Sequence, residues 1–294
     1  MKRININKDF ILFFALPVFL ILIYFINPSQ LFVTGNETSF IAIFISCLTF
    51  EFFIRKAKNG ENFYMRPIPA MQAMEEAVGR ATEMGSSVLF VPGISGLDEI
   101  DTISGVIILG HVAGMVAEYE ADLHVPCCVP IVMEAAKESC KEAYLKKGRP
   151  DLYNDSKIHY VTDDQFAYAA GVNGIMLREK PAAVFYQGKF YAESLLLAET
   201  GSSVGAIQIA GTGSSSQIPF FVTACDYVLI GEEFYAASAY LSGSPEMIGS
   251  IKGQDYVKLL CIIFIGLVVL LSFFNFVNIT QLDISSFFKI NIIN

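Results

Sequence analysis

The sequence is poor in charged residues, which make up only 17% of its 294 residues. Soluble domains usually carry about 25% charged residues, so the low share points to segments that face lipid. Tryptophan is absent, whereas phenylalanine occurs 25 times. The apolar residues gather at the two ends of the chain, where Ile, Leu and Phe dominate. We therefore expect membrane segments at both ends, with a more polar domain between them.

Basic residues are also scarce: 20 Lys and Arg stand against 29 Asp and Glu, which gives a net charge of −9. No stripe of Lys and Arg occurs in the middle of the chain. Contacts to nucleic-acid phosphates need clustered positive charge, so a nucleic-acid partner is excluded. An acidic domain should also keep away from anionic lipid and project from the membrane surface.

The familiar motifs of catalysis and metal binding are missing. No Cys-x-x-Cys pair and no His spacing matches a zinc site, so no metal ligands are predicted, and the six cysteines are expected to be structural thiols in a reducing compartment. No Gly-x-Ser-x-Gly elbow follows an expected strand, and neither a P-loop nor a complete dinucleotide fingerprint is present. Whether the protein is an enzyme, and which cofactor it uses, stays open at this level.

Three hydrophobic segments are long enough, or nearly long enough, to cross a bilayer. They are residues Phe10–Asn27, Ser39–Ile54 and Tyr256–Val277. A cleaved signal peptide is the alternative for the first segment. Its apolar run is longer than a usual signal sequence, and no small-x-small cleavage site follows it, which favours an anchor. The sequence thus predicts three transmembrane helices, two N-terminal and one C-terminal, and the lipid bilayer as a partner.

The positive-inside rule sets the expected orientation. Lys2, Arg3 and Lys8 precede the first span, Arg55, Lys56 and Lys58 follow the second, and the loop between these spans has no Lys or Arg. We expect residues 1–58 to hold two transmembrane helices, residues 59–255 to form a cytoplasmic domain, and residues 256–294 to hold the last helix and an outside tail.

The central domain alternates between short apolar runs and helical patterns, with strand starts about 20 to 36 residues apart, the length of a βα unit. Continuous apolar runs are typical of strands covered on both faces. The pattern predicts an α/β fold with a doubly wound, mainly parallel sheet of about six strands. The expected strands are Ser87–Val91, Asp122–Cys127, Ile158–Val161, Ala182–Tyr186, Ala206–Ile209 and Tyr227–Ile230.

The helical stretch Ile103–Ala117 is apolar nearly all round and carries Gly105, Gly110 and Gly114. At about 15 residues it is short for a membrane span, so a central helix buried by the sheet and by another subunit is the better interpretation. Glycine in a helix costs about 1 kcal/mol relative to alanine, which suggests a close neighbouring backbone. That neighbour is either another subunit or the domain's own sheet, and we expect a homo-oligomer.

Several stretches resemble a known family: Glu76–Gly85, Asp164–Gly171, Ala198–Gly201 and Gly231–Glu233. The family is one of prokaryotic multi-pass membrane proteins known only as a domain of unknown function. The resemblance covers roughly Arg66 to Lys258. It implies an integral protein of a prokaryotic plasma membrane and a shared α/β domain, and it supplies no catalytic residues.

The best candidate ligand site joins a glycine-rich loop to two carboxylates. Its residues are Gly211, Gly213, Ser214, Ser215 and Ser216 after one strand, and Glu232 and Glu233 after the next. Parallel strands end at one edge, so the loop amides should lie near these carboxylates, with Asp226 at the opposite edge. Such a set could bind a phosphate through a divalent cation. A merely tight βα loop, and carboxylates that only stabilise a helix start, are the simpler alternatives.

The sequence is compatible with two main functions, and a transporter is a third, less favoured hypothesis. The first is a membrane-anchored, self-associating α/β scaffold or interaction protein. The second is a membrane-tethered sensor or enzyme that binds an anionic small molecule, such as a nucleotide, at the carboxyl edge of the sheet. A transport path would require oligomers, because Glu51 and Lys258, at the near edge of the third span, are the only charged residues in the three spans.

Overall fold

The structure is a computed structural model and describes residues 37–61, 63–64 and 66–276. It divides into two compact units. One comprises residues 64–248, and the other comprises the described residues before 64 and after 248. The expected first span, Phe10–Asn27, lies outside the described residues.

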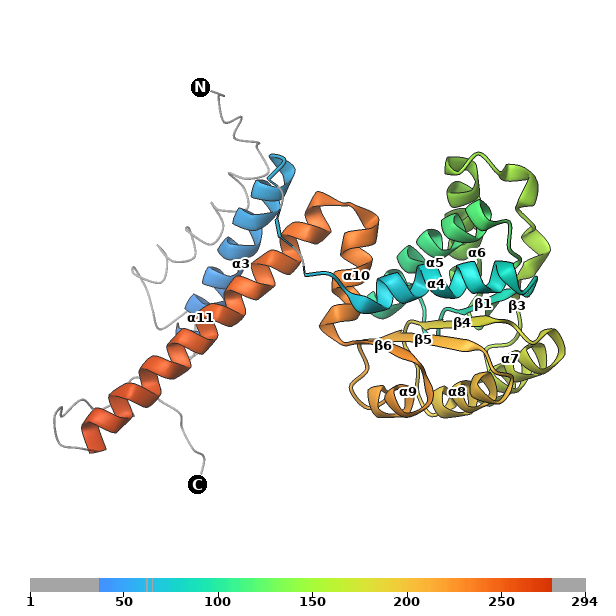
Figure 1. Cartoon of the computed structure of the whole chain (residues 1–294). Helices are drawn as coiled ribbons and strands as arrows, with labels where there is room; N and C mark the ends of the chain where they lie inside the picture. Colours follow the sequence, from blue (N-terminus) through green and yellow to red (C-terminus); the bar gives the residue numbers. More distant parts are fainter. Residues whose placement is uncertain (1–36, 62, 65, 277–294) are drawn as a thin grey trace. The chain divides into compact units, whose positions relative to one another are not determined.

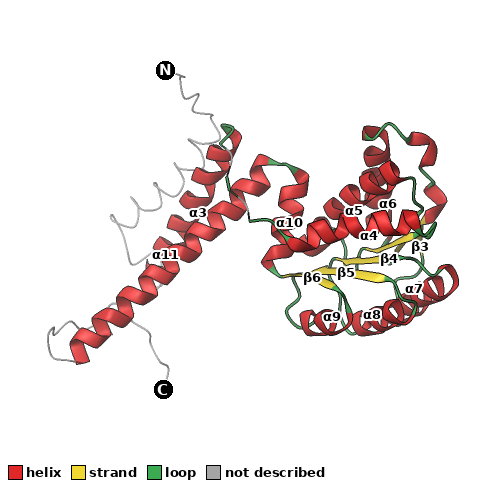
Figure 2. Ribbon diagram, in the orientation of Figure 1, coloured by secondary structure: helices red, strands yellow, loops and turns green. Residues whose placement is uncertain are grey.

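Residues 64–248 form an α/β domain around a sheet of six strands, all parallel (Figure 2). The spatial order is β3-β2-β1-β4-β5-β6. The expected parallel sheet is therefore confirmed, and the predicted strands differ from the observed ones by a few residues at their ends. The strands are β1 (Val88–Val91), β2 (Leu123–Cys127), β3 (Ile158–Tyr160), β4 (Ala183–Gln187), β5 (Ile207–Thr212) and β6 (Tyr227–Ile230).

Helices cover both faces of this sheet, as Figure 1 shows. One layer consists of α4 (Pro69–Glu83), α5 (Ile100–Tyr119), α6 (Pro130–Lys146) and α10 (Glu232–Ser242). The other consists of α7 (Gln165–Glu179), α8 (Glu193–Ser203) and α9 (Ile218–Ala224). Two short 3-10 helices, η1 (Pro150–Leu152) and η2 (Asp155–Lys157), precede β3.

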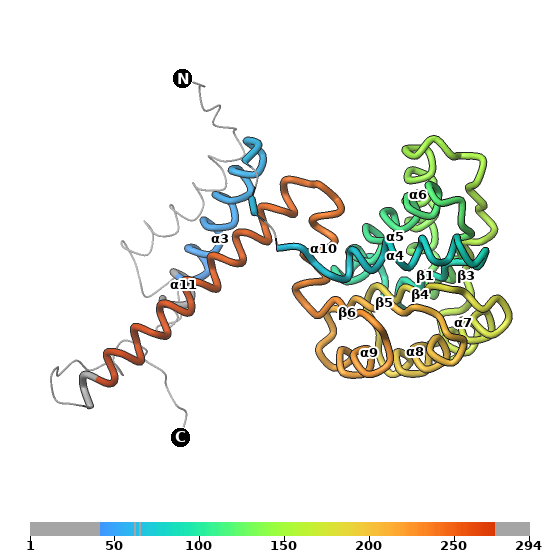
Figure 3. Tube along the Cα trace, in the orientation of Figure 1, coloured from blue at the N-terminus to red at the C-terminus, as the bar shows by residue number. Residues whose placement is uncertain are grey.

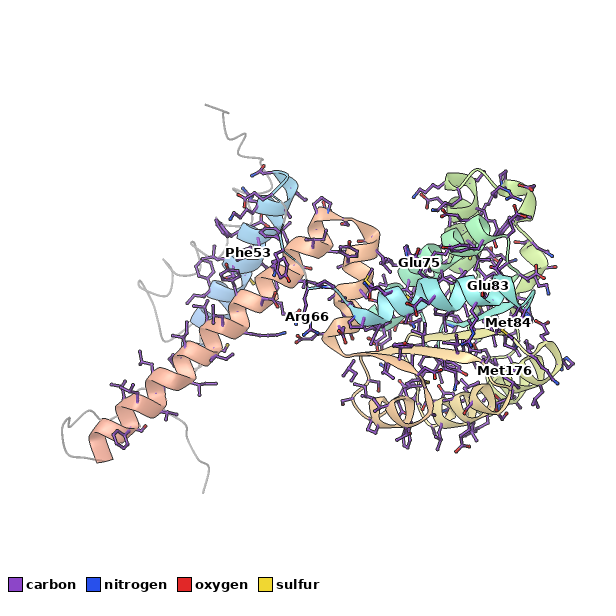
Figure 4. The ribbon with its side chains drawn as sticks, viewed as in Figure 1. Phe53, Arg66, Glu75, Glu83, Met84 and Met176 are labelled. Atoms are coloured by element: carbon purple, nitrogen blue, oxygen red, sulfur yellow. The ribbon has the colours of Figure 1, made fainter. Side chains whose placement is uncertain are left out.

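Each helical layer packs its own hydrophobic core against the sheet. Phe90, Phe185 and Phe234 belong to the core on the α5 side, whereas Tyr168 and Met176 belong to the core on the α7 side. Figure 4 labels Met176 in that second layer. Alternate residues of each strand supply the two cores, since successive side chains of a strand point to opposite faces. This two-sided burial explains why the strands read as continuous apolar runs.

Local signals set several helix ends. The Asp164 carboxylate accepts a hydrogen bond of 2.8 Å from the Ala167 amide and caps the start of α7. Gly85 follows α4 with a φ of +62°, a left-handed conformation that costs glycine little. The chain can be followed through these turns in the tube of Figure 3.

Helix α5 is the core helix of the domain. It passes a length and hydropathy test for a membrane span, yet 67% of its apolar window is buried inside the domain. This confirms the predicted burial inside the domain, whereas burial by another subunit stays a prediction. Its three glycines contact the domain itself: a Cβ on Gly105 would overlap the carbonyl oxygen of Gln187, one on Gly110 would lie 2.6 Å from Ser139 Oγ, and one on Gly114 would lie 3.6 Å from the Lys147 side chain.

The second unit contains α3 (Glu37–Lys58) and the apolar part of α11 (Pro245–Phe276). Among the described residues, two helices are long and apolar enough to cross a membrane: α5 and residues Pro245–Phe273 of α11. The prediction of three spans is therefore corrected. The C-terminal span is supported, with 0% of its apolar window buried inside the structure. Helix α3 forms over the expected second span, but Glu51, Arg55, Lys56 and Lys58 crowd its last two turns, and it is not one of the two.

Helices α3 and α11 pack closely at two glycines. A Cβ on Gly249 would lie 2.5 Å from Ile54 Cα, and one on Gly253 would lie 3.0 Å from Phe50 Cα. The rings of Phe53, labelled in Figure 4, and Tyr256 stack with centroids 4.3 Å apart. Small residues four apart let two helix backbones approach, so Gly249 and Gly253 determine this contact.

Candidate functional site

The strand order reverses between β1 and β4, the point at which ligands bind in open α/β sheets. The loops that follow these two strands contact each other there. The Ile94 amide donates a 3.0 Å hydrogen bond to the Lys189 carbonyl. Gly93 and Gly188 have φ values of +80° and +144°, and a Cβ on either would overlap the backbone of the opposite loop. Glycine is thus required on both sides of the switch point.

Buried polar side chains gather along this carboxyl edge. Eleven polar or charged side chains are buried in the described residues. Seven of them stand in the last residue of a strand, or in the loop and first helical turn that follow it: Asp101, Thr102, Gln187, Glu193, Ser194, Thr212 and Gln217. A buried polar group costs free energy unless it is hydrogen-bonded, so such a concentration calls for a chemical reason.

On the α5 side, the edge joins α5, α10 and the ends of β4 and β5. The hydroxyl of Tyr235 donates a hydrogen bond to the Asp101 carboxylate. Burial first, and then the Asp101 carboxylate, raise the pKa of Tyr235, so its hydroxyl stays protonated. Gly213 lies against this pair, since a Cβ there would overlap the Tyr235 hydroxyl. The backbone directly after β5 therefore approaches both side chains closely.

Gln187, the last residue of β4, is fully buried beneath this junction. Its amide nitrogen donates a 3.0 Å hydrogen bond to the Ile209 carbonyl. Its carboxamide oxygen faces Gly211 and has no hydrogen-bond partner among the described residues. Leaving a buried acceptor without a partner costs about 1–3 kcal/mol. Gln187 is therefore an unsatisfied polar group at the point where the strand order reverses.

On the α7 side, the central group is Glu193, the first residue of α8, which is fully buried. One carboxylate oxygen accepts a 2.9 Å bond from the Tyr191 amide, and the other accepts a 2.5 Å bond from Gln165 Nε2. No Lys, Arg or His of the described chain forms an ion pair with it. Beside it, Ser194 donates a 2.8 Å hydrogen bond to Gln217. Glu193 is a buried carboxylate held by neutral donors and by the start of a helix.

The whole edge is strongly acidic. Its loops and first helical turns carry eight carboxylates: Asp98, Glu99, Asp101, Asp163, Asp164, Glu193, Glu232 and Glu233. Lys189 is the one basic residue in these described segments, and its ammonium lies 2.5 Å from Glu99. The hydrogen bond to Glu99 raises the pKa of Lys189, so the lysine stays protonated. Its positive charge is balanced by the carboxylate of Glu99. The edge presents a negative field to any approaching ligand.

The predicted site residues lie on this edge, although not quite as expected. Gly211 belongs to β5, pairs with Leu229 and is buried, so the loop proper begins at Gly213. Part of that loop is satisfied internally: the Ser214 amide donates to Thr212 Oγ1 at 3.2 Å, and Ser214 Oγ lies 3.2 Å from Ser216 Oγ. Ser215 is exposed beside them.

The two predicted carboxylates open α10 on the same edge. Glu233 forms a 3.3 Å ion pair with Arg66, while Glu232 is exposed. Asp226 lies at the opposite edge, where it accepts a 2.8 Å hydrogen bond from the Gln208 amide. The structure thus brings the glycine-rich loop and the start of α10 together at one edge.

The residues that sequence reasoning missed belong to the switch point itself. No sequence motif marks the residues concerned, which are Asp101, Gln187, Lys189 and Tyr235. They come together through the strand order of the sheet, which no single segment of the sequence reveals. The loop Pro92–Gly96 was the available signal, because it follows the first strand and contains two glycines.

The residues at this edge are poorly suited to thiol chemistry or to metal binding. Burial, followed by Asp163, Glu193 and Asp164, raises the pKa of Cys128 to about 11, so this thiol is protonated and a poor nucleophile at neutral pH. In the part of the chain that the structure describes, no three His, Cys, Asp or Glu side chains converge as metal ligands. The edge is therefore suited to hydrogen bonding and charge recognition.

The fold defines a doubly wound α/β domain with the strand order of dinucleotide-binding proteins. Its residues do not fit a dinucleotide, because Gly93 and Gly96 lack a third glycine, and Glu99 and Asp101 stand at the start of α5, where a pyrophosphate would bind. The chain belongs to the family described as "Domain of unknown function (DUF6754)", whose profile matches residues 27–283. No curated protein matches the sequence.

Proposed function

We propose that this chain is a membrane-tethered binding protein whose domain holds a small polar ligand at the carboxyl edge of its sheet. The ligand carries no net negative charge; it is a cation, such as an organic amine, or a neutral molecule rich in hydrogen-bond donors. Binding to Glu193 and Asp101 provides the recognition, and the loops after β1, β4 and β5 form the walls.

One observation carries this proposal: the gathering of seven buried polar side chains at the edge where the strand order reverses. Two of them are chemically incomplete. Glu193 is a buried carboxylate without a cation, and the Gln187 oxygen lacks a donor. Both are acceptors, so a donor-rich ligand would satisfy them.

The charge of the edge decides between ligand classes. Against eight carboxylates stand Lys189 and Arg66, each already paired with one of them, so a bare anion would meet net repulsion. The predicted nucleotide would need a divalent cation between itself and Glu232 or Glu233. An amine or a neutral polyol needs no such intermediary, which is why we prefer it.

Thermal-shift and calorimetric titration of the full chain in mild detergent test the proposal. The probes are spermidine, arginine and glucose, set against ATP with and without Mg²⁺. We expect stabilisation by an amine or by glucose, lost in Glu193→Gln. The matched control is Glu76→Gln, which removes an exposed carboxylate from α4.

Two results would contradict the proposal. One is the absence of any shift with millimolar amines or sugars. The other is an equal response of the Glu193→Gln and Glu76→Gln variants, which would indicate binding by overall charge. Stabilisation by ATP with Mg²⁺ alone would restore the nucleotide hypothesis.

Membrane tethering is part of the same proposal. The apolar window of α11 is not buried inside the structure at all, and a helix that is apolar all round is stable when lipid surrounds it. With the domain cytoplasmic, cysteines introduced by Asn36→Cys and Asn291→Cys should react with an impermeant maleimide in intact cells. Protection of either one would reject this orientation.

Self-association stays a prediction with less support than before. It rested on a close neighbour for the α5 glycines, and those neighbours are Gln187, Ser139 and Lys147 of the same domain. A native-mass measurement in mild detergent tests it directly.

A further inference from the structure

Two histidines and a glutamate form a chain of contacts far from the carboxyl edge. His124 is the second residue of β2, and His159 is the central residue of β3. His124 Nε2 lies 3.4 Å from His159 Nδ1, and their ring centroids are 5.0 Å apart. On its other side, His124 Nδ1 lies 3.0 Å from Glu179 Oε2, at the C-terminal end of α7.

We propose that the Glu179–His124–His159 cluster is a proton-controlled contact, which keeps β3 joined to β2 while the two imidazoles share at most one positive charge and releases β3 when both are charged.

The hydrogen-bond directions follow from the chemistry of the three groups. A carboxylate can only accept, so His124 Nδ1 donates to Glu179. In the neutral pair, His124 Nε2 then accepts from His159 Nδ1–H. When one proton is added, His124 carries both N–H groups and donates to Glu179 on one side and to His159 on the other. The contact survives the first proton.

The second proton cannot be accommodated in the same way. Both facing nitrogens would then carry N–H groups and like charges at 3.4 Å, which is repulsive at any dielectric constant relevant to a protein. His124 is 6% exposed, so water screens it poorly. The repulsion is relieved when β3 moves away, because β3 is an edge strand that pairs with β2 alone.

Other charged groups near His124 and His159 also influence how readily the two imidazoles take up protons. Glu179 on α7 is the nearest negative charge, whereas Lys157 of η2 supplies both a positive charge and a backbone carbonyl near His159. The neighbour of His124 on β1 is the apolar Leu89. Burial lowers the pKa of His159, and the charge of His124 lowers it further. Glu179 and His159 lie at different nitrogens of His124, and no three His, Cys, Asp or Glu side chains of the described residues are placed to hold one metal ion, so we do not infer a metal site.

Helix α7 links the cluster to the carboxyl edge. Its last residue, Glu179, contacts His124, and its first residue, Gln165, donates to Glu193. A change in the charge of His124 therefore acts on one end of the helix whose other end holds the buried carboxylate. This consequence rests on the proposed function, whereas the proton-controlled contact itself does not.

Selective ¹⁵N-histidine labelling tests the contact, because the sequence has only three histidines. The full chain in detergent is titrated from pH 8 to pH 4. We expect two separated proton-uptake steps for the pair. In His124→Gln, the midpoint of His159 should rise by about one pH unit or more, since the neighbouring charge is gone. His111→Gln is the matched control and should leave both steps unchanged.

Hydrogen exchange at residues 158–160 provides the second readout. Corrected for the intrinsic pH dependence, it should accelerate on the order of tenfold or more through the second step. In Glu179→Gln, the first uptake should move to lower pH, which keeps the test informative if His124→Gln does not fold. Independent titration of the two rings, or exchange at β3 that ignores the second step, would overturn the proposal.

Discussion

Gly105 of α5 lies directly over the carbonyl oxygen of Gln187, the last residue of β4. The glycine has no side chain to hold them apart, so the helix approaches the strand end at the point where the strand order reverses. Asp101, one turn earlier on the same helix, thereby reaches Tyr235 of α10. One small residue thus brings α5, β4 and α10 into a single polar junction.

Replacing Gly105 tests this relationship. A methyl group there must displace a backbone carbonyl, so we expect Gly105→Ala to destabilise the domain by about 1–3 kcal/mol. Chemical denaturation followed by circular dichroism measures the change. Gly114→Ala is the control on the same helix, because its Cβ would meet only the flexible Lys147 side chain at 3.6 Å. It should stabilise by up to about 1 kcal/mol, and equal effects of both changes would contradict the packing described here.

The Asp101–Tyr235 hydrogen bond joins α5 to α10 within the junction. Tyr235→Phe removes the donor and leaves a carboxylate that is 6% exposed without it. We expect a loss of about 1–3 kcal/mol in the free energy of unfolding. In Asp101→Asn, the same Tyr235→Phe change should cost less, because the remaining acceptor is neutral. A double-mutant cycle with no coupling between the two positions would show that the bond contributes nothing.

Sequence reasoning located most of the domain because its strands are buried on both faces. Runs such as Val88–Val91 are continuously apolar, and this signal survives without knowledge of the neighbours. Gly211 and Thr212 were misassigned to a loop, because their strand character comes from pairing with β6. The close backbone contact predicted for the glycine-bearing helix is found at Gly105, whereas Gly110 and Gly114 face side chains.

The predicted ligand site and the polar junction at Gln187 lie at the same edge of the sheet but follow different strands. The glycine-rich loop after β5 is visible in the sequence, whereas the switch point between β1 and β4 depends on the strand order. Gln187 shows why this part of the site could not be predicted from the sequence. It is one glutamine at the end of an apolar run, and its importance arises from burial beneath α5 and α10.

The buried thiols should be unreactive in the folded protein. Burial raises the pKa of Cys127 to about 12 and that of Cys128 to about 11. Because the thiolate is the nucleophile, alkylation of Cys128 at pH 8 should be on the order of a hundredfold slower than that of a free thiol. Mass spectrometry after a timed iodoacetamide pulse measures this rate, and unfolding in urea should restore it. The rate should go on rising with pH up to about pH 11, whereas that of a free thiol levels off near its ordinary pKa, since the raised pKa keeps the proton on the folded thiol.

Helices α3 and α11 approach each other closely at two glycines of α11. Gly249 and Gly253 stand four residues apart on α11 and face Ile54 and Phe50 of α3. A leucine at Gly249 would have to displace the α3 backbone, so Gly249→Leu should separate the two helices. The separation can be measured with cysteines introduced by Phe53→Cys and Tyr256→Cys, whose rings stack in the native chain. With the six native cysteines replaced, a short bis-maleimide should join this pair in the parent protein and fail to do so in Gly249→Leu. Gly266→Leu is the matched control, because nothing in the described structure lies within 4 Å of a Cβ at that position. Equal cross-linking in both variants would show that α3 and α11 are held together by something other than these glycines.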